Sequence, residues 1–443
     1  MGTETEKQKA GSRWRRWWRL ALMDTQPLRQ RREFRLLFVA QAGSSFGTRI
    51  TYVAIPYQVF WLTHSPLAVG LLGLAELAPL LATALIGGAL ADAHDRRRLV
   101  RLTELGMASA SALLLVNAAL PHPRLWVLYA ASVLLAAMDG LQTPSLDALV
   151  PRLVAREELP AAVALEATRG TLGMVAGPAL GGVLVAAAGL PAAYGVDVVS
   201  FGFSLLLLSR MRAVPPPPGA PRVSLRGVLE GLRYARSRPE LLGTYVVDIV
   251  AMLFGMPLAL FPAIAERYGG AGVLGLLYAA PATGALLANL TSGWLGRSRR
   301  HGAGILGAAG FWGLAITAFG VAFGAGGPLW LALLLLGAAG AADMVSGLFR
   351  STIWNQTIPD ELRGRLGGIE LLSYSIGPTL GNVEAGAVAS AFTVTASVVS
   401  GGLLCVAGVG GCALLLPAFR RYDSVAFMAL TRANPTNPRS GAH

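Results

Sequence analysis

The sequence predicts an all-α membrane protein with twelve transmembrane helices in two pseudo-symmetric six-helix bundles. Of its 443 residues, 54% are hydrophobic and only 14% are charged, with a mean hydropathy of +0.55, whereas about a quarter of a typical soluble domain is charged. Apolar runs of roughly 20 residues, long enough to cross a bilayer as helices, recur along the chain. The chain also contains an internal sequence repeat, which we call an echo: the Gly-Pro-Ala-Leu-Gly of 177–181 recurs as Gly-Pro-Thr-Leu-Gly at 377–381. Duplicated apolar halves are typical of secondary transporters.

Two further echoes support the duplication. The Gly-Ala-Leu at 88–90 pairs with the Gly-Trp-Leu at 293–295, and Asp139 pairs with Asp343, at offsets of 205 and 204 residues. These nearly constant offsets predict bundles at 34–210 and 241–418. A cytoplasmic linker (211–240) joins them, a basic arm (1–33) precedes them and a cytoplasmic tail (419–443) follows.

Hydropathy places six helices in each half. In the first half we predict them at 35–62, 67–91, 98–120, 124–144, 161–188 and 192–210. In the second half they fall at 241–264, 271–296, 303–324, 328–349, 365–391 and 394–418.

The distribution of positive charge predicts the orientation. The net charge of +13 comes from arginines concentrated in the arm, the 92–101 loop, the linker, the 297–300 loop and the end of the last helix. The alternate loops carry few cations, which is the positive-inside pattern of a protein in the bacterial inner membrane with both termini cytoplasmic. This distribution argues against nucleic acid as a partner. Trp14, Trp17 and Trp18 lie at helical spacing among arginines and predict an amphipathic helix on the anionic inner leaflet; a disordered basic tail is the alternative.

The loop after the second helix carries a recognisable motif. It reads Gly-Ala-Leu-Ala-Asp-Ala-His-Asp-Arg-Arg-Arg over 88–98. This resembles the loop motif G-x-L-A-D-R-x-G-R-R-R of the major facilitator superfamily, with Ala93 and Asp95 as departures. We expect Gly88 to permit close helix packing and Asp92 to face a helix N-terminus. The motif residues are Gly88, Asp92, Arg96, Arg97 and Arg98.

The fifth helix carries a second motif. Its Gly173-x-x-x-Gly177-Pro178-x-x-Gly181-Gly182 resembles the antiporter motif of the same superfamily, which is associated with exporters. Small residues four apart make a close-packing face, and a proline bends the helix. Ordinary helix packing is the alternative reading.

The stretches 34–41, 149–160 and 358–365 resemble the efflux branch that includes the enterobactin exporter and the macrolide and multidrug proton antiporters. One departure concerns helix four, where many proton-coupled exporters carry R-x-x-Q-G. Here Ala136 takes the Arg position and Asp139 the Gln position. The usual proton relay therefore does not transfer whole.

Ionisable residues inside apolar spans are functional candidates, because an unpaired charge in hydrocarbon is costly. The resemblance implies that helices one, four, seven and ten line the cavity. We expect Asp248 and Asp343 to carry the proton, Asp139 to come next, and Arg49 to pair with one of these carboxylates. Asp197 and Glu104 are expected to be structural. The remaining proton-coupling candidates are Glu76 and Glu384, and the predicted substrate contacts are Gln41, Ser45, Tyr52, Met252 and Phe254.

These observations predict a monomeric transporter, not an enzyme, that exports a small amphipathic drug, siderophore or secondary metabolite by proton antiport. No cofactor or metal is expected, and the sequence has no nucleotide-binding Gly-Lys-Ser/Thr motif. Cys405 and Cys412 lie in one helix and indicate no disulfide. An importer or a lysophospholipid flippase on the same fold is the alternative.

Overall fold

A computed structural model describes residues 24–214, 233–234, 236, 238–358 and 360–424. Within these ranges every regular element is a helix. The predicted amphipathic segment around Trp14, most of the linker and the end of the tail lie outside the described residues.

In its described residues the first half contains one short helix, five long helices and a 3-10 turn. They are α2 (Gln26–Gln30), α3 (Arg32–Thr63), α4 (Pro66–Ala93), α5 (Arg96–Ala119), α6 (Leu125–Leu153), η1 (Arg156–Glu158) and α7 (Leu159–Ser209). Helix α7 contains the predicted fifth and sixth helices. They are divided at Gly189, whose φ of 80° and ψ of 175° interrupt the helix. A residue without Cβ adopts this backbone at little cost.

The second half follows the same plan with an extra break. Its elements are α9 (Pro239–Gly255), η2 (Leu258–Leu260), α10 (Phe261–Tyr268), α11 (Ala271–Leu290), η3 (Ser292–Arg297), α12 (His301–Gly324), α13 (Leu329–Thr357), α14 (Asp360–Ala391), α15 (Val394–Leu415) and α16 (Pro417–Arg420). The span predicted over 241–264 lies within Pro239–Tyr268, but its helix is interrupted between Gly255 and Leu258, where the 3-10 turn η2 begins. Pro257 lies inside this break and has no N–H to continue the ladder.

Two helices are longer than hydropathy indicates. Helix α6 continues to Leu153, beyond the predicted end at 144, and α13 continues to Thr357, beyond 349. The added segments carry charged residues, Asp147 and Arg152 in α6 and Arg350 in α13, so an apolar window stops before the helix does. In the described part of the chain, nine helices are long and apolar enough to span a membrane, and one of these is the bent α7. The count of twelve spans stays a prediction.

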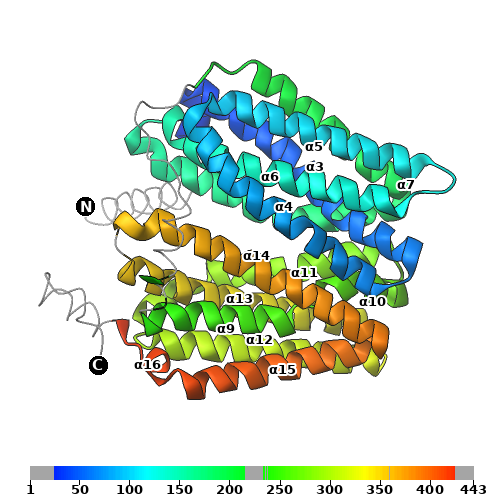
Figure 1. Cartoon of the computed structure of the whole chain (residues 1–443), viewed down its shortest axis with the longest axis vertical. Coiled ribbons are helices and arrows are strands. Elements are labelled where there is room, and N and C mark those ends of the chain that lie inside the picture. The colour runs from blue at the N-terminus through cyan, green and yellow to red at the C-terminus, as the bar shows by residue number, and fades with distance from the viewer. Residues whose placement is uncertain (1–23, 215–232, 235, 237, 359, 425–443) are drawn as a thin grey trace, which may run out of the picture.

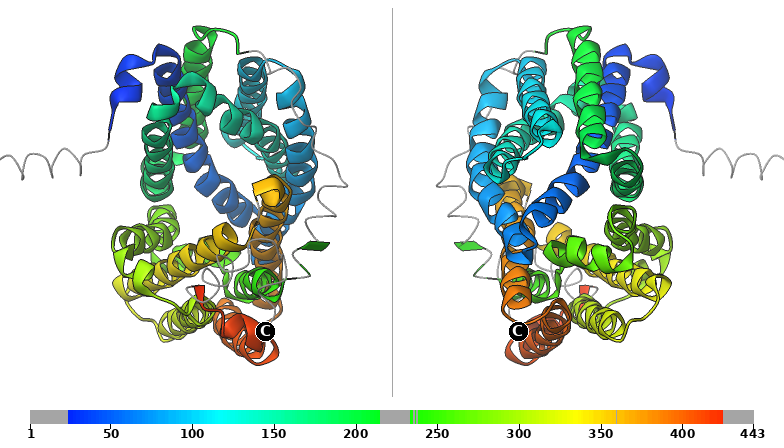
Figure 2. Two further views of the ribbon diagram at one scale, coloured as in Figure 1. Left: turned by 90° about the vertical axis from the view of Figure 1, so that its left-hand side faces the viewer. Right: turned by 90° about the vertical axis from the view of Figure 1, so that its right-hand side faces the viewer.

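The helices form two bundles. Figures 1 and 2 show α3–α7 together in one bundle and α9–α15 in the other. The bundles meet where α7 packs on α11 and α14 packs on α4. We call these two helix crossings the seam.

The seam repeats the duplication of the sequence. Gly70 of α4 lies against the backbone of Asn382 and Val383 in α14, and Gly275 of α11 lies against Pro178 and Gly182 in α7. The second crossing is therefore the first with the halves exchanged. The structure confirms the pseudo-symmetry that the sequence echoes predict, and it assigns the repeated glycines to contacts where a Cβ would clash.

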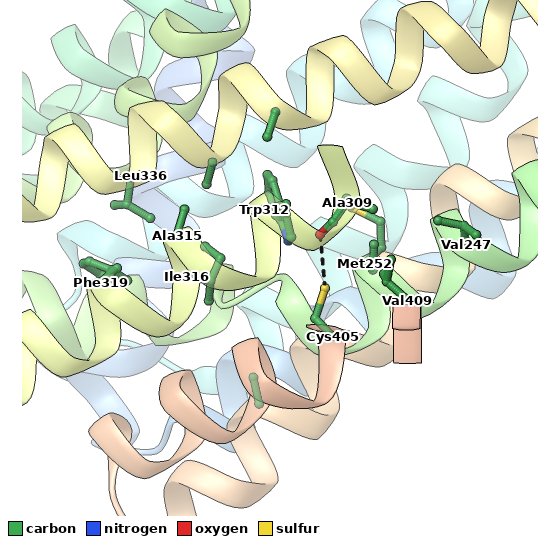
Figure 3. Close-up of a cluster of buried hydrophobic side chains, with 14 of the residues drawn as sticks. Val247, Met252, Ala309, Trp312, Ala315, Ile316, Phe319, Leu336, Cys405 and Val409 are labelled. Carbon is green, nitrogen blue, oxygen red and sulfur yellow. Dashed lines mark hydrogen bonds between the residues drawn. The ribbon is translucent and has the colours of Figure 1, made fainter. Parts of the chain in front are cut away.

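Each bundle has its own apolar core. The larger core fills the second bundle and includes Trp312, Phe319 and Leu336. Figure 3 shows Trp312 beside Ala309 on α12, with Cys405 of α15 donating a weak hydrogen bond from Sγ to the Ala309 carbonyl at 3.8 Å. Cys405 and Cys412 are both free and buried.

Candidate functional site

A buried ion pair links α9 to α13. The guanidinium of Arg350 contacts the Asp248 carboxylate directly through Nη1 and Oδ1, and both side chains are 4% exposed. The hydroxyl of Ser373 on α14 donates a 2.9 Å hydrogen bond to the other oxygen, Asp248 Oδ2. Three helices thus converge on one carboxylate. A carboxylate with a cation and a hydroxyl donor is stabilised in its ionised form.

A second carboxylate lies on the same helix as the arginine. Asp343 precedes Arg350 by seven residues, which places both on one face of α13 two turns apart. Its Oδ1 lies 3.6 Å from Arg350 Nη2, a longer contact than that of Asp248, and its side chain is 41% exposed. The two aspartates therefore share one cation unequally. The Asp248 carboxylate is buried with both oxygens engaged, whereas the Asp343 side chain is partly exposed.

Aromatic side chains flank the shared cation. The Arg350 guanidinium lies 5.7 Å from the ring centre of Tyr374. Tyr374 meets the Trp354 ring edge-on at 6.3 Å, and Trp354 stacks on Tyr245 at 5.5 Å. Trp354 also donates from Nε1 to Thr244 Oγ1 at 2.9 Å. A planar guanidinium suits both carboxylate and aromatic partners, so this environment selects arginine over lysine.

A small cavity opens beside the aspartates, inside the second bundle. Its volume is about 10 Å³, the room that roughly one water molecule needs. It is lined by Val247, Asp248, Ala251, Met252, Ala309, Trp312, Asp343 and Ser346. This volume holds nothing of drug size, so the cavity is not the compartment for an exported compound.

Arg49 was predicted to pair with Asp248, Asp343 or Asp139, and the first two contact a different arginine. Both aspartates contact Arg350, which the sequence prediction placed one residue beyond helix ten. Arg49 instead packs its Cβ against Gly177 of α7 and acts electrostatically on Asp139. Arg350 was missed because a hydropathy window ends helix ten at 349, although the spacing of seven from Asp343 is visible in the sequence.

The other three carboxylate candidates lie apart from the pair. Asp139 is exposed on α6, whereas Glu76 on α4 and Glu384 on α14 are half-buried. No ion pair joins any of the three to another described residue. Their predicted role in proton coupling stays a prediction.

Two predicted substrate contacts are engaged inside the first bundle. Gln41 is buried and donates from Nε2 to Glu104 Oε1 at 2.7 Å. Ser45 accepts a 2.6 Å hydrogen bond from Arg169 Nη1, and Arg169 also forms an ion pair with Glu166 at 2.6 Å. These bonds fasten α3 to α5 and α7 and do not support the prediction that Gln41 and Ser45 contact substrate. Glu104 fills the structural role expected of it.

The three other predicted substrate contacts, and the structural candidate Asp197, lie in different places. Tyr52 is 47% exposed and meets Tyr278 of α11 edge-on at 5.6 Å, so the two tyrosines connect the bundles. Met252 lines the cavity, whereas Phe254 packs against the core of the second bundle. Asp197 is fully buried and accepts hydrogen bonds of 2.7 Å from Thr51 and Ser111, which fits its expected structural role.

The arginines of the 88–98 loop bind helix ends within the first bundle. Arg96 donates to the carbonyls of Ala91 and Ala148, and Arg97 donates to those of Leu208 and Ser209. Carbonyls at helix C-termini lack intrahelical donors, so the bonds to Ala91, Leu208 and Ser209 stabilise the ends of α4 and α7. Asp95, which departs from the motif, is the N-cap of α5, and its carboxylate accepts from the backbone N–H groups of Arg97 and Arg98.

The roles expected of Gly88 and Asp92 in this loop both stay predictions. The Asp92 side chain lies outside the described part of the structure, so its role stays a prediction. The observed close approach in this region is at Gly87, which lies against Gly140 and Leu141 of α6. Arg98 is exposed.

The helix-five motif lies in the seam and against helix one. A Cβ at Gly177 would collide with Arg49, one at Gly181 would lie 3.1 Å from Ile50 Cα, and one at Gly182 would lie 2.8 Å from Gly275 Cα. A Cβ at Gly173 would meet nothing within 4 Å. The motif is therefore the surface on which α7 packs against α3 and α11.

Comparison with known proteins places this architecture. Residues 24–441 match the family described as transmembrane secretion effector. The chain belongs to this family of the major facilitator superfamily. It is 32% identical over 410 residues to the enterobactin exporter EntS of Citrobacter koseri, covering 91% of this chain and 95% of that protein. It is 31% identical to the enterobactin exporter EntS of Shigella boydii serotype 18 with the same coverage.

Solved structures of this superfamily share the fold at low identity. A bacterial homologue of the iron transporter ferroportin, in its inward-facing state, matches with a TM-score of 0.65 and 18% identity, over 88% of this chain and 98% of that chain. A bacterial homologue of the human lysosomal transporter Spinster, inward-facing and unoccupied, matches with a TM-score of 0.66 and 18% identity, over 90% and 98%. The chain is thus a multi-pass membrane transporter of the major facilitator type.

Proposed function

We propose that this transporter exports a siderophore or a similar amphipathic compound from the bacterial cytoplasm in exchange for protons. The observation that carries the proposal is the Asp248–Arg350–Asp343 cluster on helices seven and ten. The similarity to enterobactin exporters over most of both chains supports the substrate class. The helix-five motif, which packs in the seam, supports export.

The unequal sharing of Arg350 suggests a division of roles. Asp248 is buried and both of its oxygens are engaged, so it keeps its charge through the cycle. Asp343 has the longer contact and the exposed side chain, and it exchanges the proton. Neutralising Asp343 frees part of the Arg350 charge, and this change biases the two-state equilibrium between the bundles.

The position of the seam suggests which state the structure represents. The close contacts lie at 66–73 with 379–386, and at 178–186 with 271–275, near the cation-poor loops. With the arginine-rich loops in the cytoplasm, the bundles are closed on the outer side. This is an inward-facing arrangement, as in the ferroportin and Spinster homologues.

The proposal is tested in proteoliposomes loaded with enterobactin. We expect efflux to depend on an imposed proton gradient and to stop with a protonophore. Asp343→Asn is expected to transport without dependence on the gradient, while Asp147→Asn, which alters an exposed aspartate of α6, behaves as wild type. Gradient-independent transport by the wild type contradicts proton antiport. Transport of lysophospholipid but not enterobactin favours the flippase alternative.

A further inference from the structure

A cation without a protein partner lies midway along α3. Arg49 is half-buried, and it forms no hydrogen bond or ion pair with any other residue that the structure describes. Arg169 of α7 and Arg350 of α13, by contrast, each hold a carboxylate. A charge at membrane depth is costly and is a candidate functional group by default. Its position far from either end of α3 separates Arg49 from lipid headgroups and leaves its guanidinium free to bind a ligand.

The stem of Arg49 is fixed, while its charge acts on neighbouring helices. A Cβ on Gly177 would collide with Cβ of Arg49 and lie 3.1 Å from its Cγ, so α7 packs against the aliphatic part of the side chain. The guanidinium acts electrostatically on Asp139 of α6 and on Tyr52 of α3, and both of these side chains are exposed. Figure 2 shows α3, in dark blue, running between the other helices of its bundle towards the second bundle. Arg49 therefore shares one accessible region inside the transporter with Asp139 and Tyr52.

An aromatic pair lies one helical turn from Arg49. Tyr52 follows Arg49 by three residues, which places both side chains on one face of α3, about 4.5 Å apart along its axis. The Tyr52 side chain is 47% exposed, and its ring meets Tyr278 of α11 edge-on at 5.6 Å. Tyr278 meets Phe261 edge-on at 5.1 Å. Aromatic rings favour edge-on and offset partners, so the uncovered part of Tyr52 suits a further ring beside the guanidinium.

We propose that Arg49 and Tyr52 form a binding site for an aromatic acid, the ionised end of an exported aromatic compound. The ring of the ligand packs against Tyr52, and the planar fork of Arg49 donates two parallel N–H bonds to its carboxylate. This inference rests on the proposed function and narrows its substrate class. Arg49 is a binding residue in this proposal, not the partner of a proton-carrying aspartate.

Two carboxylates oppose the binding of an acid at this place. Asp139 interacts with Arg49 from beyond ion-pair distance, and Glu76 of α4 acts on Tyr52. Coulomb energy falls with distance, so an anion in direct contact with the guanidinium gains more than it loses to these more distant charges. Neutralising Asp139 removes a competitor for Arg49 and strengthens the binding of an acid. A merely structural arginine predicts no such effect.

The test compares an aromatic acid with its neutral amide. Binding of 2-naphthoate and of 2-naphthamide to the full-length protein in micelles is measured by equilibrium dialysis against protein-free micelles. We expect the wild type to bind the acid more tightly. Arg49→Met keeps the stem beside Gly177 and is expected to weaken acid binding about tenfold or more, the effect of one hydrogen bond to a charged group, with amide binding unchanged. Arg124→Met alters an exposed arginine before α6 and keeps wild-type binding.

Two further variants keep the proposal refutable if Arg49→Met does not fold. Asp139→Asn is expected to tighten acid binding several-fold, and Tyr52→Leu is expected to weaken the binding of acid and amide alike. The site is overturned by equal or absent binding of acid and amide in the wild type, by wild-type acid binding in folded Arg49→Met, or by an unchanged acid affinity in Asp139→Asn. None of these measurements uses a proton gradient, so failure here leaves gradient-dependent efflux of enterobactin, the test of the proposed function, to be decided separately.

Discussion

Removing the shared cation is the most direct perturbation of the site. Arg350→Met keeps an unbranched, apolar side chain of similar length but leaves Asp248, which is 4% exposed, beside Asp343 without the guanidinium. Breaking a buried ion pair from one side typically costs about 3–5 kcal/mol, because the remaining charge stays desolvated. We expect a loss of this size in the free energy of unfolding.

The double variant Arg350→Met with Asp248→Asn separates this cost from lost packing. Because the amide is neutral and still accepts from Ser373, we expect the double variant to recover most of the stability. Replacing both members of a buried pair is often close to neutral. Arg169→Met is the matched control in the first bundle. Its partner Glu166 keeps a 21% exposed side chain, so the expected loss is smaller, about 1 kcal/mol.

The assay is unfolding of purified protein in mixed micelles, followed by intrinsic fluorescence as denaturant is added. All four proteins are compared at equal detergent and pH. The reasoning is refuted if Arg350→Met is no less stable than Arg169→Met, or if the double variant is as unstable as Arg350→Met alone. The first outcome would show that Asp248 is solvated, and the second that Arg350 acts through packing alone.

Two further predictions concern the seam and the helix-five motif. A Cβ on Gly272 would lie 3.7 Å from that of Ala186, within the range for disulfides. The double variant Ala186→Cys, Gly272→Cys should therefore cross-link the bundles on oxidation and stop efflux until a reductant is added. Full-rate efflux by the cross-linked protein would show that this seam does not open. Gly177→Ala should lower the free energy of unfolding by about 1–3 kcal/mol, since its Cβ meets Arg49. Gly173→Ala, whose Cβ has nothing within 4 Å, should be neutral or stabilising. Equal stability of the two variants in the micelle assay would contradict the packing role.

Local chemistry made much of the fold predictable. A membrane offers no water to unpaired backbone groups, so every long apolar run must be a helix. Duplication then revealed the two bundles, and the repeated glycines Gly70 and Gly275 proved to mark equivalent crossings. Where the prediction failed, the reason is also local. Helices α6 and α13 continue into segments with charged residues, where a hydropathy window stops, and Pro257 breaks a span that is apolar on both sides of it.

The sequence by itself determined the fold class, the duplication and the presence of charges inside the spans. It did not determine which charges meet. Asp248 and Arg350 are separated by about a hundred residues, and their contact depends on how α9 and α13 rotate against each other when the core around Trp312 packs. Hydropathy records only how apolar a segment is, whereas the partner of a buried charge is set by helix rotation and depth. Rotation and depth are decided by packing between helices, so only the tertiary structure shows that Arg350 is the cation beside Asp248 and Asp343.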